Sequence, residues 1–199
     1  MINLRKASVY DIEQIVVIHC DAFADFFLTE LGPTFLSFYY SCFIRSNEGM
    51  VLCAEENGKV IGFSATAKRC RGFNLSMIKN NINHFMWISI VLLFSNPKAL
   101  FRLVRNLTKT NGHVIDTEDY AELYSIAVKK GEQGKGIGRK LLLETENRLK
   151  VNNIRQISLT TDCFNNEATI AFYKSMKYDI FYEFITYPQR KMYRLIKKI

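Results

Sequence analysis

The sequence predicts an α/β fold in which a mixed β-sheet is covered by helices on both faces. Several short stretches alternate apolar and polar residues, as half-buried strands do. Longer stretches repeat their apolar residues at helical spacing, and an Asn-Gly pair joins two strand-like stretches as a hairpin. Strands and helices that follow one another in this order build a layered, mixed sheet.

The size and composition of the chain indicate one globular domain. Its 199 residues are 48% hydrophobic and 23% charged, with three prolines and no low-complexity tract. A chain of this length can bury one core of useful size, and its composition excludes the disordered and fibrous classes. We therefore expect a single domain over residues 1–199.

The first elements run from an edge strand to an aromatic helix. Residues 2–7 alternate like a strand, and Ser8 can cap the helix that follows. That helix has Ile12, Ile15, Val16 and His19 on one face. A second helical stretch opens at Gly32-Pro33 and is rich in phenylalanine and tyrosine.

The remaining elements follow in a regular order. Strands at 50–55 and 59–65 flank Asn57-Gly58, whose residues accept the positive φ of a type I′ turn. A helical, irregular segment fills about 68–118. The order then continues with a strand (121–128), a glycine-rich loop, a helix (137–152), a strand (157–161), a helix (167–176) and two closing strands.

An apolar run at 85–94 lies inside the irregular segment. Its sequence, FMWISIVLLF, is half of the roughly 20 residues that a membrane span needs. A buried helix, an interfacial patch or a partner surface therefore remain the open readings. Because the N-terminus also lacks the layout of a signal peptide, we expect no stable membrane insertion.

The formal charge of +8, from 27 basic and 19 acidic residues, suits an anionic partner. The excess is spread along the chain, and no reading helix or RNA-binding aromatic motif accompanies it. We expect no nucleic-acid partner. Five cysteines (Cys20, Cys42, Cys53, Cys70, Cys163) and three histidines are scattered, which predicts no disulfide framework, no metal site and a cytoplasmic location.

The glycine-rich loop is the segment with recognisable chemistry. An apolar strand runs into Gln133-Gly134-Lys135-Gly136-Ile137-Gly138, and a helix starts at once. Glycines let successive backbone N–H groups converge, and the helix N-terminus adds free N–H groups and a positive dipole end. This arrangement suits a pyrophosphate, although a merely tight strand-to-helix connection would have similar residues. The spacing fits neither a Walker loop nor a Rossmann fingerprint.

Two motifs resemble those of the GNAT superfamily of N-acetyltransferases. The first is Q-x-x-G-x-G at Gln133–Gly138; the second is Asn166 followed by Phe172-Tyr173 on a helix, one helix and one strand downstream. The resemblance implies a mostly antiparallel central sheet flanked by helices. It also implies that the helical segment at about 68–118 is an insertion between the third and fourth strands, where the family makes a tight hairpin.

The resemblance further implies which residues bind acetyl-coenzyme A, the expected cosubstrate. The strand backbone would bind the pantetheine amides, the glycine-rich loop would bind the pyrophosphate, and an asparagine would bind the cofactor arm near the thioester. These residues are, in that order, Ile126, Ala127 and Val128; Gln133, Gly134, Lys135, Gly136, Ile137, Gly138, Arg139 and Lys140; and Asn166.

The expected reaction is direct transfer of the acetyl group to a primary amine in a ternary complex. Tyr173 stands where the family places the acid that protonates the departing thiolate, and Glu122 resembles the catalytic base of some members. The alternative for Tyr173 is an aromatic residue that only packs in the helix, and the alternative for Glu122 is a solvent-exposed residue at the start of a strand. Weaker candidates for the base are Asp21, Asp25, Glu30, Asp116 and Asp119, and Cys163 is a remote candidate for an acyl-enzyme.

Two features of the sequence depart from the family pattern. Lys177 replaces the usual glycine after the second motif, so the turn there must differ or be strained. The insertion at 68–118 is a candidate substrate lid, dimer surface or structural elaboration, so a homodimer is possible.

The acceptor is an amine on a small molecule in our interpretation. Residues 26–36 with Tyr39-Tyr40 resemble a segment of GNAT-like enzymes associated with bacterial surface-polysaccharide synthesis, which implies a nucleotide-linked amino sugar. Lys68, Arg69 and Arg71 would form a basic mouth for its diphosphate. Acetylation of a protein or peptide, and a non-catalytic acyl-coenzyme A sensor, are the alternatives.

Overall fold

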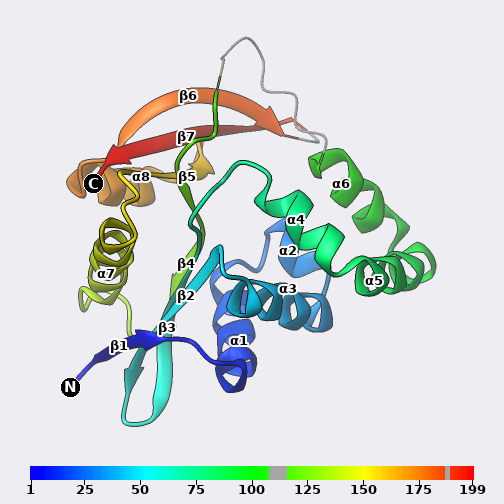
Figure 1. Cartoon of the computed structure of the whole chain (residues 1–199), viewed down its shortest axis with the longest axis horizontal. Helices are drawn as coiled ribbons and strands as arrows, with labels where there is room; N and C mark the ends of the chain where they lie inside the picture. The colour runs from blue at the N-terminus through cyan, green and yellow to red at the C-terminus, as the bar shows by residue number, and fades with distance from the viewer. Residues whose placement is uncertain (108–115, 187–188) are drawn as a thin grey trace.

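The computed structural model describes residues 1–107, 116–186 and 189–199, and its centre is a seven-stranded sheet in the order β1-β2-β3-β4-β5-β7-β6 (Figure 1). Among the described strands, β4 and β5 alone pair in parallel, and the other neighbours are antiparallel. The strands are β1 (Asn3–Lys6), β2 (Gly49–Glu56), β3 (Lys59–Ala67), β4 (Ala121–Val128), β5 (Gln156–Asp162), β6 (Asp179–Thr186) and β7 (Arg190–Lys198). The mixed, mostly antiparallel fold class is confirmed.

The described helices flank this sheet, and three of them lie between β3 and β4. They are α1 (Ile12–Ala22), α2 (Phe27–Glu30), α3 (Pro33–Arg45), α4 (Phe73–Asn80), α5 (Ile82–Ser95), α6 (Pro97–Leu107), α7 (Ile137–Val151) and α8 (Glu167–Ser175). The helical insertion between the third and fourth strands is therefore present as α4, α5 and α6. Residues 108–115 of its predicted range, which include His113, lie outside the described residues.

Alternation along the strands divides the interior into two cores. In β2, Val51 and Cys53 join a cluster with α1 and α3, whereas Leu52 and Ala54 join a cluster with α7. Neighbouring strand residues point to opposite faces, so one apolar strand serves both layers. Figure 1 shows α7 and α8 on one side of the sheet and α1 to α6 on the other.

The local signals near the N-terminus are mostly confirmed. Asn57 and Gly58 adopt φ values of 50° and 74°, as the predicted type I′ turn requires. The first helix differs in its start: a 3-10 turn at Val9–Asp11 comes before α1. Ser8 is the N-cap of this turn, and the Asp11 carboxylate accepts hydrogen bonds from the Ser8 N–H at 2.7 Å and from the Ser8 hydroxyl at 2.9 Å.

The turn after α8 is strained at the position where the sequence departs from the family glycine. Lys177 has φ of 65°, in the left-handed region that a side chain disfavours. The Tyr178 N–H still bonds the Tyr173 carbonyl at 3.0 Å, so the helix ends as a glycine-containing turn would end it.

The apolar run at 85–94 forms most of α5. Phe85, Ile88 and Leu92 pack against the α1–α3 core, while the opposite side of the helix faces outward. Within the described residues, no helix combines the length and apolar character needed to cross a membrane.

Candidate active site

The centre of the site is the point where β4 and β5 separate. These strands pair only at Ala121–Leu123 and Ile157–Leu159, and beyond these residues β4 continues with its ladder to β3 alone. Ala65 faces Ser125 and Thr66 faces Leu123, so Tyr124 is an extra, bulged residue in β4. The β5-facing backbone groups of the rest of β4 are therefore available to a ligand.

A main cavity of about 1020 Å³ occupies this opening. Ile126, Ala127 and Val128 line it from β4, and Thr160 and Thr161 line it from β5. An extended chain with amide groups that entered here would find a strand edge to pair with. The structure thus brings the three strand residues predicted to bind pantetheine into one cavity wall.

The glycine-rich loop forms the next part of the wall. Gly134 and Gly136 adopt φ values of 78° and 75°, and Gly136 is the N-cap of α7, whose cap has no side-chain hydrogen bond. The first N–H groups of α7 therefore lack intrahelical partners. The Gln133 amide donates to the Val128 carbonyl at 3.2 Å, which ties the loop to the end of β4.

A smaller loop cavity of about 390 Å³ adjoins the main one and shares Val128, Gln133, Gly134 and Gly138 with it. Gly136, Ile137, Arg139 and Glu132, the partner of Lys135, complete its lining on the loop side. An anion held here would meet free N–H groups, the positive end of the α7 dipole and one arginine. These residues fit the pyrophosphate of coenzyme A.

Two of the predicted loop residues stand apart from both cavities. Lys135 and Lys140 line neither of them. The Lys135 ammonium instead forms an ion pair with Glu132 at 2.7 Å on the exposed side of the loop. Their charge can attract an anion at longer range, but the structure gives them no direct place in the cradle.

Asn166 is the N-cap of α8 and Tyr173 lies on this helix, and both line the main cavity. The Asn166 amide nitrogen is held by the Thr161 hydroxyl at 2.5 Å and by the Asp162 carbonyl at 3.2 Å. Tyr173 is 6% exposed, and burial raises the pKa of its hydroxyl above the usual value of 10. Its phenol therefore stays protonated at neutral pH.

Glu122 lies elsewhere, in a buried ionic network at the start of β4. Its carboxylate lies 3.1 Å from the Arg194 guanidinium and accepts a hydrogen bond from the Cys70 thiol at 2.8 Å. Arg194 also bonds the Ser158 and Tyr182 hydroxyls and approaches Asp116 at 3.7 Å. Glu122 does not line the main cavity, so the geometry does not bring the two predicted catalytic residues together.

His19 is a cavity residue that the sequence interpretation passed over. It is 2% exposed, and its Nδ1 lies 2.6 Å from the Tyr40 hydroxyl, which also donates to Ser125 at 3.3 Å. Its Nε2 is buried and has no hydrogen-bond partner among the described residues. Burial lowers its pKa to about 4, so the ring is neutral at pH 7.

The signal for His19 was present in the sequence as a polar residue on the apolar face of α1. A buried ring nitrogen without a partner is costly, which makes it a place where a ligand can bind favourably. Only the tertiary structure shows that α1 lies against the opening between β4 and β5.

Aromatic residues and two arginines form the end of the main cavity near α1 and α2. Phe23, Phe26 and Phe27 line it. Arg102 pairs with Glu30 at 2.6 Å, and Arg190 pairs with Asp162 and lies 4.5 Å above the Phe26 ring. The weaker base candidates have other positions, because Glu30 and Asp116 are paired and neither Asp21 nor Asp25 lines the cavity.

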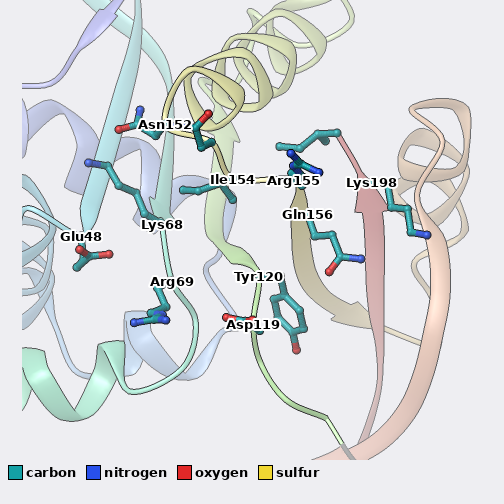
Figure 2. Close-up of a pocket in the computed structure, with 12 residues that line it drawn as sticks. Glu48, Lys68, Arg69, Asp119, Tyr120, Asn152, Ile154, Arg155, Gln156 and Lys198 are labelled. Atoms are coloured by element: carbon teal, nitrogen blue, oxygen red, sulfur yellow. The ribbon is translucent and has the colours of Figure 1, made fainter.

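The predicted basic mouth belongs to a different cavity. Lys68 and Arg69 line a basal cavity of about 880 Å³ at the start of β4 and β5, which shares no lining residue with the main cavity. Figure 2 shows them with Asp119, Arg155 and Lys198 around this space. Arg102 and Arg190 are instead the arginines of the main cavity. Cys163 lines neither cavity.

Comparison with known proteins gives one family and one fold. Residues 12–178 match the sequence model of the acetyltransferase (GNAT) family. Searching curated protein sequences gives no match.

Three solved structures illustrate the fold similarity. A putative GNAT acetyltransferase from Desulfovibrio desulfuricans has a TM-score of 0.64 at 12% identity, over 100% of this chain and 99% of that one. The ribosomal-protein-S18-alanine N-acetyltransferase from Escherichia coli has a TM-score of 0.63 at 17% identity, over 100% of this chain and 94% of that one. The PaiA N-acetyltransferase from Thermoplasma acidophilum, solved in complex with coenzyme A, has a TM-score of 0.60 at 19% identity, over 100% of this chain and 99% of that one.

Proposed function

Since the chain belongs to the acetyltransferase (GNAT) family and is an acyl-coenzyme A N-acyltransferase, we propose that it acetylates a primary amine of a small acceptor directly, in a ternary complex. One observation carries this proposal. A single cavity joins the open edge of β4, the glycine cradle and the buried Tyr173 hydroxyl to a pocket end lined by aromatic residues.

The cosubstrate supplies an acetyl group activated as a thioester, and the chain supplies binding and proton control. The β4 edge at Ile126–Val128 binds the amides of the arm, and the loop from Gln133 to Arg139 binds the pyrophosphate. Asn166 bonds the arm near the thioester. This division places the cosubstrate between β4 and β5 and leaves the end near α1 and α2 for the acceptor.

Tyr173 is the acid in this proposal. As the amine nitrogen bonds to the acyl carbon, the carbon–sulfur bond breaks and the sulfur takes the phenolic proton. A phenol suits this role because its pKa stays above that of a thiol, about 8.5, and burial raises it further. The acid is then protonated before each turnover, as the reaction requires.

His19, rather than Glu122, faces the acceptor amine. The Tyr40 hydroxyl donates to Ser125, so His19 can donate from Nδ1 to the Tyr40 oxygen and keep the lone pair on Nε2. With a pKa of about 4, the ring accepts a hydrogen bond from the amine but is too weak a base to remove the proton alone. His19 is thus a positioning residue, and the amine proton leaves to water.

The acceptor that we propose is an amino sugar linked to a nucleotide. Phe26 offers a ring for stacking, and Arg102 and Arg190 can turn from their carboxylate partners toward a diphosphate. The five cysteines, all free thiols, support a reducing compartment such as the cytoplasm as the place of the reaction.

A protein N-terminus is the second candidate acceptor, because two structures of similar fold are named ribosomal-protein-alanine N-acetyltransferases. An open peptide groove with acidic residues would suit that substrate. The acceptor end of the main cavity has two arginines instead.

The test is thiol release from acetyl-coenzyme A with four acceptor classes: free amino sugars, nucleotide-linked amino sugars, polyamines and peptides. We expect release with nucleotide-linked amino sugars. Release with peptides alone would move the acceptor to the second candidate. Binding of acetyl-coenzyme A without release to any class would support the sensor alternative, and absence of binding would contradict the cradle.

A further inference from the structure

The outward side of α5 is an apolar surface with no cover in the described structure. Met86, Trp87, Ile90 and Phe94 follow one another at helical spacing, and Trp87 and Phe94 are 66% and 84% exposed. Large side chains at such spacing normally mark the buried face of a helix. In α5 the buried face is a different one, formed by Phe85, Ile88 and Leu92.

In addition to this stripe on α5, the neighbouring helices of the insertion carry exposed apolar side chains. Leu75 on α4 and Phe101 on α6 are also more than half exposed. Figure 1 shows α5 and α6 at the outer edge of the molecule, on the side opposite α7 and α8. Exposed large apolar side chains grouped on one helix of a folded protein, with more on its neighbours, indicate an interaction site.

The charged residues of α4 and α6 are all basic, and one of them, Arg102, is paired with Glu30 of α2. The chain contains no aspartate or glutamate between Glu56 and Asp116. The same part of the chain carries Lys79 at the end of α4 and Lys98 and Arg105 on α6, all exposed. The partner of this surface must therefore be apolar where it meets the stripe and anionic around it.

We propose that α4, α5 and α6 dock this protein on the surface of an anionic lipid bilayer. Exposed tryptophan, phenylalanine and leucine with a rim of lysine and arginine are the composition of helices that lie in the headgroup region. At 14 residues α5 is about 21 Å long, too short to cross a hydrocarbon core of about 30 Å. The helix thus lies along the surface, with its stripe among the acyl chains.

A second copy of the chain fits this surface less well. A two-fold dimer through α5 would bring the same stripe, and with it the same lysines and arginines, against themselves. None of α4, α5 and α6 contains an acidic residue that could compensate them. The stripe lies on one side of a helix and does not belong to a groove, because neither the main nor the basal cavity includes an α5 residue. A bilayer needs no matching groove.

The chain has a built-in probe for this proposal, because Trp87 is its only tryptophan. Titration with vesicles of phosphatidylglycerol and phosphatidylcholine should shift the tryptophan emission to the blue, and lipids brominated on the acyl chain should quench it. Vesicles of phosphatidylcholine alone should give neither effect. Salt at 0.5 M should weaken binding to the anionic vesicles.

Variants separate the apolar and the ionic contribution. Ile90→Ser with Phe94→Ser keeps Trp87 and should lower vesicle affinity at least tenfold, whereas Val151→Ser, at an 82% exposed site on α7, should not. Lys79→Gln with Lys98→Gln should lower it about 5-fold per charge, and Lys150→Gln with Lys174→Gln less. Coenzyme A affinity should remain unchanged in every variant, which verifies folding.

Two outcomes would overturn the proposal. One is an unshifted Trp87 spectrum with anionic vesicles at low salt. The other is a dimer in sedimentation that the Ile90→Ser, Phe94→Ser variant abolishes, with no vesicle binding by the parent protein. The second outcome would assign the stripe to a second copy of the chain.

Discussion

The two ends of the β4–β5 pair contrast with each other. At the end that begins with Ala121 and Ile157 the strands are bonded to each other, and there the side chains of Glu122 and Arg194 form a buried ionic network. At the end that reaches Val128 and Asp162 the strands separate around the main cavity. One end satisfies its polar groups internally, and the other leaves them for a ligand.

This contrast shows why a residue's place in a motif strand does not by itself give its role. Glu122 and Ile126 lie four residues apart on β4, yet one is paired inside the protein and the other faces the cavity. The bulge at Tyr124 and the loss of pairing after Leu123 lie between them. The chemistry changes where the backbone pairing changes.

The largest effect that we expect comes from the closed end of the β4–β5 pair, where the two strands are bonded to each other. Glu122→Gln leaves Arg194 buried without its main partner and should cost about 3 kcal/mol of unfolding free energy, or about 6–12 °C in Tm. Turnover per folded molecule should remain, because Glu122 does not line the cavity. Thermal unfolding and thiol release measure the two quantities.

A matched control for this variant is Glu144→Gln, which breaks an ion pair on the surface of α7. It should change stability by less than about 0.5 kcal/mol. A Glu122→Gln protein of normal stability with turnover lowered a hundredfold would instead make Glu122 the catalytic base and remove the contrast.

At the open end, Tyr173→Phe should lower kcat about 100-fold, because it removes the acid while the ring stays packed. Calorimetry should give an unchanged Kd for acetyl-coenzyme A. The control is Tyr178→Phe on the neighbouring ring, whose hydroxyl donates to Glu146 at 3.0 Å; this variant should affect stability and leave kcat intact. Equal loss of kcat and binding in Tyr173→Phe would indicate packing alone.

His19 should make stability depend on pH. Its pKa is lowered to about 4 from 6.5, so between these values the unfolded chain binds a proton that the folded chain does not. Stability is therefore complete above pH 6.5 and falls as the pH drops toward 4. Urea unfolding should show a loss of about 2 kcal/mol from pH 7 to pH 5.

His19→Gln should remove this part of the pH dependence and raise the KM for the amine more than the KM for acetyl-coenzyme A. An unchanged pH slope in the variant would mean that another group titrates. Unchanged KM values would limit His19 to a structural contact with Tyr40.

The smallest expected effect is at the cradle. Gly138 is helical, and a Cβ there would approach the Val128 side chain at an ordinary 3.8 Å. Gly138→Ala should therefore stabilise the fold by about 0.5 kcal/mol. The added methyl group enters the cavity lining and should weaken coenzyme A binding about tenfold. A more stable protein with unchanged affinity would place the pyrophosphate elsewhere.

Local sequence signals determined most elements of this protein. Asn57-Gly58 specified the hairpin, and the glycine-rich loop specified where β4 ends and α7 begins, because positive φ and a helix start depend on adjacent residues. The two motifs also predicted the residues of the cradle and Tyr173, and the family match agrees with the resemblance on which these predictions rest. Turns and helix starts depend on neighbouring residues, so the local sequence is enough to predict them.

Tertiary structure alone decided which of these residues share a site. Glu122 meets Arg194 across 72 positions, and His19 reaches the cavity only because α1 packs beside β4. Lys68 and Arg69 fall at the opposite end of β4 from the cavity that they were predicted to serve. Such pairings depend on where the strands separate and which face each helix covers, and both follow from packing of the whole chain.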